Sequence, residues 1–394
     1  MNKSGTVLHG ALLVAGTSIG GGMLALPVLT SVGGFVPSLV IYIACWLFMA
    51  CTGLLFLEIS LWMQGESNII SMAKRTLGEP GKWAAWAIYL FLFYCLTLAY
   101  IVGCGNLVVE LLGNRIPDWA GPILFLLAFG PFVYAGARLV GKLNIFLMLG
   151  LGLSFLAFVF FGWQYVNPKL LTYSNWSMAL IGLPISFTAF AYQGIIPTLI
   201  NYLHHDAKKT RLAILIGSFI PLVTYIIWQW LILGIVPTEV PGGLLETLEQ
   251  GQNAVHPLKN FLAKPYIYAI GQFFAFFALV TSFFGVTLGL VDFLADGLNV
   301  KKTSLVKLAL CALVFVPPLI IALLYPHIFL IALDFAGGFG CATLLGLMPI
   351  LMVWSGRYIL GLHSEYALPG GRLTLTLLLL FVLFELGVEI YLKI

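Results

Sequence analysis

Charged residues are scarce in this chain of 394 residues, and their scarcity excludes most soluble folds. Only 9% of the residues are Asp, Glu, Lys or Arg, whereas 61% are hydrophobic. A soluble domain carries about 25% charged residues. We therefore interpret the chain as a polytopic membrane protein whose main surroundings are a lipid bilayer. Its net charge of +4 does not indicate a nucleic-acid partner.

Cysteine and histidine are also few, and neither is placed as catalytic or metal-binding chemistry requires. All six cysteines fall inside apolar runs, so we expect no disulfide and no metal framework. The six histidines lie at the ends of apolar runs or between them, and no H-E-x-x-H motif occurs. Without a recognisable catalytic set, we expect no enzyme and no bound cofactor.

Long apolar runs are abundant, and a spanning helix needs about 20 apolar residues. We predict an all-α integral membrane protein with eleven spans: 6–32, 35–62, 84–112, 119–137, 141–163, 177–200, 211–236, 264–297, 303–325, 327–358 and 371–392. Three of these spans are long enough to require tilt or extension past the bilayer: 35–62, 264–297 and 327–358.

The positive charges predict the orientation of the chain in the membrane. With the N-terminus inside, five of the 19 Lys and Arg residues lie outside, namely Arg115, Lys169, Lys259, Lys264 and Lys393, and the other 14 lie inside. Cytoplasmic loops carry the excess of positive charge. We therefore place the N-terminus inside and the C-terminus outside.

The longest stretch between spans, 237–263, lies on the outer side in this topology. Its leucines and glutamates, Leu244, Leu245, Glu246, Leu248 and Glu249, suggest a short helix over the outer mouth. A solvated loop is the alternative interpretation of the same residues.

The first span contains an unusual sequence, AGTSIGGGMLALP, from Ala15 to Pro27. Each Gly costs a helix about 1 kcal/mol relative to Ala. The three glycines Gly20, Gly21 and Gly22 weaken the helix at mid-membrane, where free backbone groups are most costly. A close-packing helix interface would explain part of this pattern, because residues 16–20 match G-x-x-x-G.

The sixth span repeats this arrangement in SFTAFAYQGIIPTL, from Ser186 to Leu199. Two Gly/Pro-interrupted spans at corresponding positions of two halves point to a transporter site. We predict a first five-helix repeat over 6–163 and an inverted five-helix repeat over 177–358. Residues 371–392 would then form an additional, eleventh helix.

A bound zwitterion would satisfy the backbone groups that two broken helices leave free. N–H groups at a half-helix N-terminus suit a carboxylate, and unwound carbonyls suit an ammonium. The candidate substrate-binding residues are Thr17, Ser18, Gly20, Gly21 and Gly22 in the first span and Phe190, Tyr192 and Gln193 in the sixth. The aromatic residues among them, with the Gln193 amide, favour an aromatic or large apolar substrate.

At these residues the sequence resembles the hydroxy and aromatic amino acid permease family, the bacterial tyrosine and tryptophan permeases. Besides the two broken spans, the resemblance rests on FFALVTSFFGVTLGLVDFLADGL and FAGGFGCATLLGLMPILMVW. It implies the LeuT-type fold of the amino acid–polyamine–cation superfamily and a multi-pass protein of the bacterial cytoplasmic (inner) membrane. It also implies import of tyrosine, or of tryptophan, driven by an ion gradient that is usually of protons. Many members read Phe-His-Gly where this chain reads Tyr192-Gln193-Gly194.

The coupling ion is open between Na⁺ and H⁺. The eighth span places Ala278, Thr281 and Ser282 on one helix face. Sodium-coupled relatives of the fold bind Na⁺ with such a carbonyl-and-hydroxyl set, completed by two first-span carbonyls. By alignment of the break, those carbonyls belong to Gly16 and Ile19.

A proton would need a titratable group instead, and Asp334 in the tenth span is the candidate coupling or gating residue. We expect Glu58, Asp292 and Asp296 to pair with Arg138 or with inner-loop lysines. We expect Glu110, Glu385 and Glu389 to be solvated near the outer face.

The function that these patterns favour is an amino acid symporter that works by alternating access and is a monomer. A channel is disfavoured because a pore needs a continuous polar lining, whereas the polar residues here cluster at mid-membrane. A polyamine substrate is disfavoured because neither broken span carries an acidic residue. Tryptophan or another large neutral amino acid remains an alternative substrate.

Overall fold

The structure is a computed structural model that describes residues 5–63 and 67–394, and the described residues form an all-helical protein. The helices of the first part of the chain are α1 Val7–Ser18, α2 Gly21–Thr30, α3 Phe35–Trp62, α4 Ile69–Leu111, α5 Ala120–Ala135 and α6 Ala137–Gly162. Three short 3₁₀ helices follow: η1 Trp163–Tyr165, η2 Leu170–Thr172 and η3 Trp176–Gly182.

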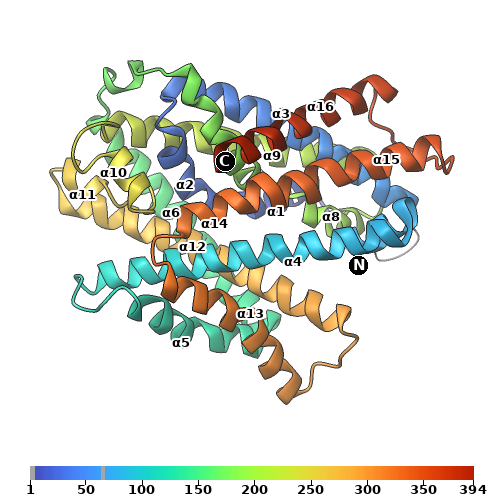
Figure 1. The fold of residues 1–394 in the computed structure, drawn as a ribbon, viewed down its shortest axis with the longest axis horizontal. Helices are drawn as coiled ribbons and strands as arrows, with labels where there is room; N and C mark the ends of the chain where they lie inside the picture. The colour runs from blue at the N-terminus through green and yellow to red at the C-terminus, as the bar shows by residue number, and fades with distance from the viewer. Residues whose placement is uncertain (1–4, 64–66) are drawn as a thin grey trace.

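The second part of the chain repeats the alternation of long and broken helices. Its elements are α7 Leu183–Ala189, η4 Gln193–Ile195, α8 Ile196–Tyr202, α9 Ala207–Ile235, α10 Leu244–Glu249, α11 Leu258–Phe261, α12 Pro265–Gly297, α13 Ser304–Leu324, α14 Phe329–Phe335, the π-helix η5 Ala336–Leu347, α15 Met348–Tyr358 and α16 Gly371–Lys393. In Figure 1, α5 and α13 lie side by side at one edge and pack against α4, while α5 also contacts α6 and α13 also contacts α12.

Within the described residues, nine helical segments are long and apolar enough to cross a membrane, and the bent pair α1–α2 makes a tenth. The helix α5, with 16 residues, is apolar but shorter. Each of the eleven predicted spans coincides with one of these segments. The count of eleven spans and the orientation of the termini stay predictions.

The third predicted span is longer in the structure than its sequence indicates. The helix α4 begins at Ile69 rather than near residue 84, after an N-terminal capping box formed by Asn68 and Ser71. Gly78 interrupts the regular helix with φ of 74°, a value that favours glycine, and Pro80 follows it. The extra turns therefore lie before a kink, and only the part after the kink matches the predicted span.

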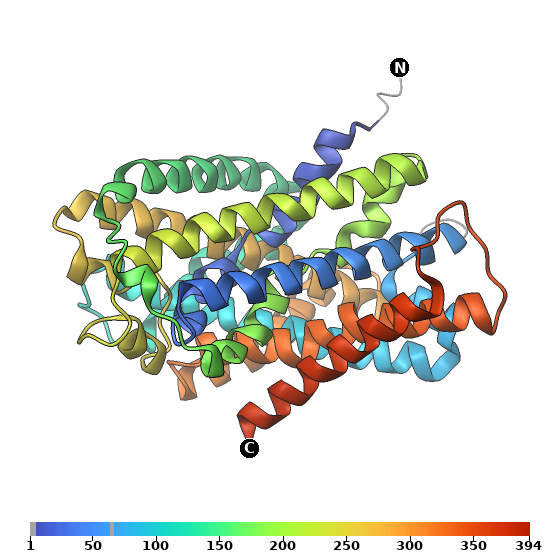
Figure 2. The ribbon, with the colours of Figure 1, turned by 90° about the horizontal axis from the view of Figure 1, so that it is seen from above.

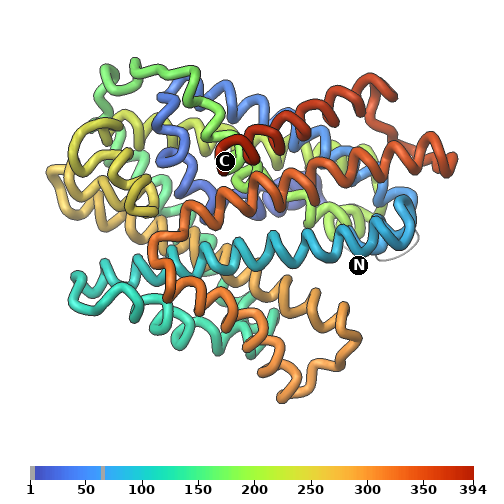
Figure 3. Tube along the Cα trace, in the orientation of Figure 1, coloured from blue at the N-terminus to red at the C-terminus, as the bar shows by residue number. Residues whose placement is uncertain are grey.

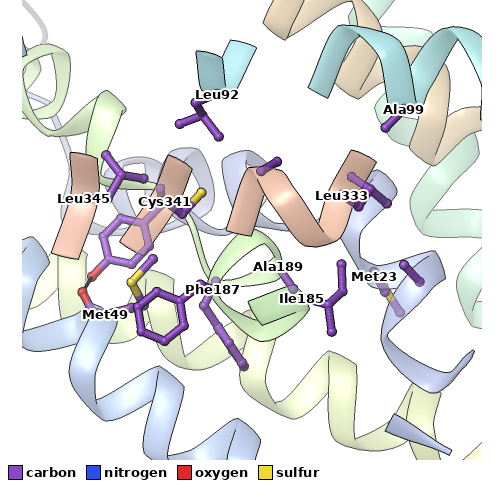
Figure 4. Packing of buried hydrophobic residues seen from close by; sticks show 14 of the residues in the cluster. Met23, Met49, Leu92, Ala99, Ile185, Phe187, Ala189, Leu333, Cys341 and Leu345 are labelled. Atoms are coloured by element: carbon purple, nitrogen blue, oxygen red, sulfur yellow. Dashed lines mark hydrogen bonds between the residues drawn. The ribbon is translucent and has the colours of Figure 1, made fainter. Parts of the chain in front are cut away.

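The core of the protein lies around α7 and the π-helix η5. Figure 4 shows Ile185, Phe187 and Ala189 of α7 next to the segment that carries Leu333 and Cys341, with α4 on the far side of that segment. Helices α2 and α3 contact α7 as well. The first half of the broken sixth span, α7, is thus packed within the protein, and a membrane interior tolerates irregular backbone only within protein or next to a water-filled cavity.

The outer loop 237–263 folds as its leucines and glutamates predicted. It contains α10, which lies against α2, and the short helix α11. The N–H of Ala254 donates to the carbonyl of Leu24, so the loop is tied to the second half of the broken first span. The alternative of a loop without a helix is excluded.

Candidate functional site

The first span is broken where its glycines predicted. Helix α1 ends at Ser18, α2 begins at Gly21, and the two are bent by 55°. The last carbonyls of α1 and the first N–H groups of α2 have no partners within their own helices. Two partners come from elsewhere: Tyr225 of α9 donates its hydroxyl to the Ser18 carbonyl at 2.7 Å, and Ser282 of α12 accepts from the Gly21 N–H at 3.1 Å.

The sixth span is broken beside the first. Helix α7 ends at Ala189, and regular structure resumes only at Gln193. The Tyr225 hydroxyl lies 2.8 Å from the Ala189 carbonyl, so one phenol reaches the exposed carbonyl ends of both broken spans. At Gly22, an added Cβ would lie only 3.2 Å from the Cα of Ala189. The two breaks are therefore in contact, as a shared substrate site requires.

The hydroxyl of Ser18 is the clearest sign of a missing ligand at this place. Ser18 is 6% exposed, and its Oγ has no hydrogen-bond partner among the described residues. Buried polar atoms are nearly always hydrogen-bonded, so an orphaned hydroxyl beside two helix breaks calls for an explanation. A polar ligand seated at the breaks would supply the missing partner.

Tyr100 of α4 is a further candidate site residue, which the sequence did not single out. A Cβ on Gly21 would collide with Cε1 of Tyr100 and would lie 3.1 Å from Cδ2 of Leu279. The ring therefore lies directly on the first turn of α2. The available signal was a tyrosine among apolar residues near the middle of a predicted span, but the sequence does not tell which face of that span turns inward.

Thr17 does not lie in the break, contrary to its assignment with Ser18. Its side chain is exposed, and its hydroxyl donates back to the Leu13 carbonyl at 2.8 Å. Consecutive residues of a helix point in directions about 100° apart. Only Ser18 of this pair can face the bundle while α1 stays helical.

Phe190 and Tyr192 are buried at the second break but have different surroundings. The ring of Phe190 meets Tyr225 edge-on at a centroid distance of 5.1 Å and Tyr42 at 6.3 Å. The hydroxyl of Tyr192 donates to the Met49 carbonyl of α3 at 3.1 Å. Phe190 thus belongs to an aromatic group around the breaks, whereas Tyr192 is directed toward α3.

The amide of Gln193 is engaged by protein groups rather than held free at the break. Its Nε2 donates to the Met49 carbonyl at 3.1 Å and to Thr52 Oγ1 at 3.0 Å. Its Oε1 accepts from the N–H of Tyr192 at 2.9 Å. In this arrangement Gln193 holds the unwound segment against α3. Contact with a substrate would require the amide to give up one of these hydrogen bonds.

Two members of the candidate cation set, Ala278 and Ser282, lie next to Gly20, which is itself a candidate substrate residue. A Cβ on Gly20 would touch Ser282 Oγ and lie 3.9 Å from the Ala278 carbonyl oxygen. The hydroxyl of Thr281 lies 2.8 Å from the Phe277 carbonyl and 3.1 Å from the Ala278 carbonyl of its own helix. An added Cβ on Gly16 would meet Met148 of α6 at 3.3 Å. A sodium site that includes Gly16, Ile19 and Thr281 stays a prediction.

The comparison with known proteins decides the family. The model of the tryptophan/tyrosine permease family matches residues 3–389. Tyrosine-specific transport system 1 of Haemophilus influenzae is 34% identical over 386 residues, which cover 96% of this chain and 94% of that protein. The tryptophan-specific transport protein of Pseudomonas aeruginosa is 30% identical, with coverage of 95% and 92%. The chain belongs to the tryptophan/tyrosine permease family.

Solved structures agree with this assignment at the level of the fold. The crystal structure of MhsT in complex with L-phenylalanine superposes with a TM-score of 0.70 at 14% identity and covers 99% of both chains. The manganese transporter of Eremococcus coleocola gives a TM-score of 0.61, also at 14% identity. The permease has the LeuT-type fold, is a multi-pass protein of the bacterial inner membrane, and is a transporter rather than an enzyme.

At the predicted inner end of the permease, Glu58 pairs with a residue other than the expected ones. Its carboxylate receives two hydrogen bonds from Arg357 of α15, at 2.6 and 2.5 Å, rather than pairing with Arg138 or a loop lysine. Both Arg357 and Glu58 also bond the backbone of Leu368. Asp292 pairs with the inner-loop residue Lys302, as predicted.

At the predicted outer end of the permease, Glu110 is largely buried rather than solvated. Its side chain is 15% exposed, and Oε1 accepts from the Tyr268 hydroxyl at 2.5 Å and lies 3.2 Å from His256 Nδ1. Glu110 and His256 line a small pocket together with Asn106, Val109, Asn114, Asp118, Gln252, Pro326 and His327. The outer loop folds over this region because α10 and α11 return the chain toward α2 and α12.

Two further carboxylates at the predicted outer end are buried rather than solvated. Glu385 and Glu389 of α16 were expected in water, but both are fully buried. The candidate coupling residue Asp334 lies with them, and its Oδ2 accepts from Nζ of Lys393 at 2.5 Å. The helix α16 packs on η5 along this face, so the span itself shields the glutamates from water and lipid.

Proposed function

We propose that this permease imports an aromatic amino acid, tyrosine in preference, across the inner membrane by alternating access around the two broken spans. The observation that supports the proposal most strongly is the contact between the two breaks. The Tyr225 hydroxyl reaches a backbone carbonyl at each break. The orphaned hydroxyl of Ser18 lies beside the same contact. Backbone groups of both polarities that lack partners within their own helices, gathered at one place, suit a zwitterion better than a ligand of one charge.

The substrate carboxylate would lie at the N-terminus of α2. The N–H groups of Gly20, Gly21 and Gly22 begin that helix, and the positive end of its dipole favours an anion. In the present arrangement the Gly21 N–H donates its hydrogen bond to the Ser282 hydroxyl. The substrate ammonium would lie on the opposite side, near the carbonyl ends of α1 and α7.

The substrate ring would pack among the aromatic side chains around the breaks. Phe190, Tyr225, Tyr42 and Tyr100 are all buried there. Edge-to-face contacts between aromatic rings contribute about 0.5–1.5 kcal/mol each beyond their area. The relatives named as tyrosine- and tryptophan-specific support an aromatic substrate, and the tyrosine-specific relative at 34% identity supports the preference for tyrosine.

Coupling to a cation gradient is what would allow accumulation. One cation that enters down a membrane potential of about −150 mV supplies about 3.5 kcal/mol. This energy corresponds to roughly 2.5 decades of concentration for a substrate with no net charge. We favour protons on the basis of the family resemblance, with a sodium site formed by α1 and α12 as the alternative.

The test is uptake of labelled tyrosine by purified permease in liposomes. We expect uphill uptake when protons are driven inward without Na⁺, and inhibition by excess unlabelled tryptophan or phenylalanine. Uphill uptake only on an inward Na⁺ gradient would replace the proton with Na⁺ and assign the candidate ion site, which consists of Gly16, Ile19, Ala278, Thr281 and Ser282. Uptake of another amino acid but not of tyrosine would contradict the substrate while leaving the fold unaffected.

A further inference from the structure

Two glutamates of the last helix, α16, face the interior of the protein. Glu385 and Glu389 are four residues apart, so they share one helix face, and neither is exposed. The opposite face is apolar and exposed, as in a helix next to lipid: Leu380 is 59% exposed and Leu383 is 49% exposed. Figure 3 shows α16 running along the span formed by α14, η5 and α15. The two carboxyl groups therefore lie between helices, inside the protein.

The surface of η5 that faces these glutamates leaves room for the carboxyl group of Glu389. An added Cβ on Gly338 of η5 would lie 2.5 Å from Cδ and 2.8 Å from Oε2 of Glu389. The carboxyl group of Glu389 thus lies on bare backbone, which only glycine provides. Asp334, just before η5, pairs with Lys393 at 2.5 Å, and Lys393 Nζ lies 3.8 Å from Glu389 Oε1.

The charges in this cluster do not balance if every carboxyl group is ionised. Asp334, Glu385 and Glu389 are three acids, and Lys393 is one base. All four oxygens of the two glutamates lack a hydrogen-bond partner, and no ion pair of the described residues includes Glu385. The other titratable groups near Glu385 are the thiols of Cys45 and Cys341, which supply no positive charge. A buried carboxylate with no partner takes up a proton rather than stay charged.

The cluster is connected to the substrate site through a short path of contacts. Thr188 of α7 donates its hydroxyl to the Leu333 carbonyl at 2.8 Å, next to Asp334. At Gly337 there is no room for a Cβ, because Pro184 and Thr188 of α7 occupy the space. Thr188 precedes Ala189, where α7 ends at the break. A shift of η5 against α16 would therefore move the half-helix that borders the substrate, and π-helical turns often occur at functional sites.

We propose that Glu385 and Glu389, with Asp334 and Lys393, form a proton-binding site in which Glu385 holds a proton in the present arrangement. During transport α16 and η5 move apart and admit water, the O–H bond of Glu385 breaks, and water takes the proton and solvates the carboxylate left behind. The proton binding stands on the geometry of the cluster. Its exchange during transport rests on the proposed function.

Infrared spectroscopy of the purified full-length permease tests the proton directly. At neutral pH, we expect the absorption of a protonated carboxylic acid in the wild type and its loss in Glu385→Gln, a change that keeps the shape of the protonated acid. Glu365→Gln, in the exposed loop after α15, is the matched control and should leave the band unchanged. A wild type without this band, or a band that persists in both Glu385→Gln and Glu389→Gln, would overturn the proton site.

Transport in liposomes tests the coupling. We expect Glu385→Gln to retain exchange of labelled for unlabelled tyrosine without any gradient, but to lose accumulation driven by an inward proton gradient. Accumulation by Glu385→Gln at the wild-type level would overturn the coupling role. If the wild type itself accumulates tyrosine only with Na⁺, the proposed proton coupling fails and the role of Glu385 in transport fails with it, whereas the infrared result still decides the proton site.

Discussion

The hydroxyl oxygen of Ser282 accepts a hydrogen bond of 3.1 Å from the backbone N–H of Gly21, across 261 residues of sequence. This bond joins α12 to the first turn of α2, where the broken first span resumes. Ser282 is also a candidate cation ligand, and the N–H of Gly21 is a candidate donor to the substrate carboxylate. The ion and substrate sites of this permease would therefore be joined by a hydrogen bond. Binding at one site would then change the affinity of the other.

We expect Ser282→Ala to weaken tyrosine transport about tenfold, because a buried N–H left without its acceptor costs about 1–3 kcal/mol. The measurement is the KM for tyrosine in liposomes, repeated at several concentrations of the driving cation. Ser304→Ala, at the exposed start of α13, serves as the control. Unchanged kinetics in Ser282→Ala would show that the bond to Gly21 is dispensable.

Tyr225→Phe removes the hydroxyl that reaches the carbonyl ends of both broken spans. We expect a folded protein whose tyrosine KM rises about tenfold, because Ser18 and Ala189 lose a buried donor. Uptake kinetics and the elution profile in detergent are measured together. Tyr134→Phe, on the exposed side of α5, should behave as the wild type. An equal effect of both changes would contradict a specific role for Tyr225.

Alanine substitutions test the close approach of the backbone at the breaks. Gly21→Ala would drive a methyl group into the ring of Tyr100, and Gly22→Ala would crowd Ala189 at 3.2 Å. We expect both to reduce uptake by about tenfold or more, through steric strain of about 1–3 kcal/mol. Gly285→Ala in α12 is the control, since no atom lies within 4 Å of its added Cβ. Normal uptake by Gly21→Ala would mean that Tyr100 moves aside at little cost.

The pair Glu58–Arg357 predicts a large effect on stability. The Glu58 side chain is 2% exposed, and removing one partner of a buried pair costs about 3–5 kcal/mol. We expect Arg357→Met to lower the thermal unfolding temperature more than the double variant Glu58→Gln/Arg357→Met, which leaves no unpaired charge. Thermal unfolding in detergent measures both. A double variant that is less stable than Arg357→Met would refute this account.

The sequence by itself determined the membrane class, the positions of the apolar helices and the break in the first span. These properties follow from local composition: apolar runs need a bilayer, and three glycines at mid-span interrupt a helix wherever the span is placed. The short helix in the outer loop was predictable for the same reason, because its leucines and glutamates lie within six residues.

The tertiary structure alone decided which side chains meet. The path from Tyr225 to Ser18 and Ala189 joins three spans, and the face of a uniformly apolar helix that turns inward cannot be found by periodicity. The same reason explains why the side-chain directions of Thr17 and Gln193 and the partner of Glu58 could not be predicted. Glu385 and Glu389 lie near the predicted outer end of their span, where water would be the natural partner. Only the packing of α16 on the glycines of η5 places them inside the protein.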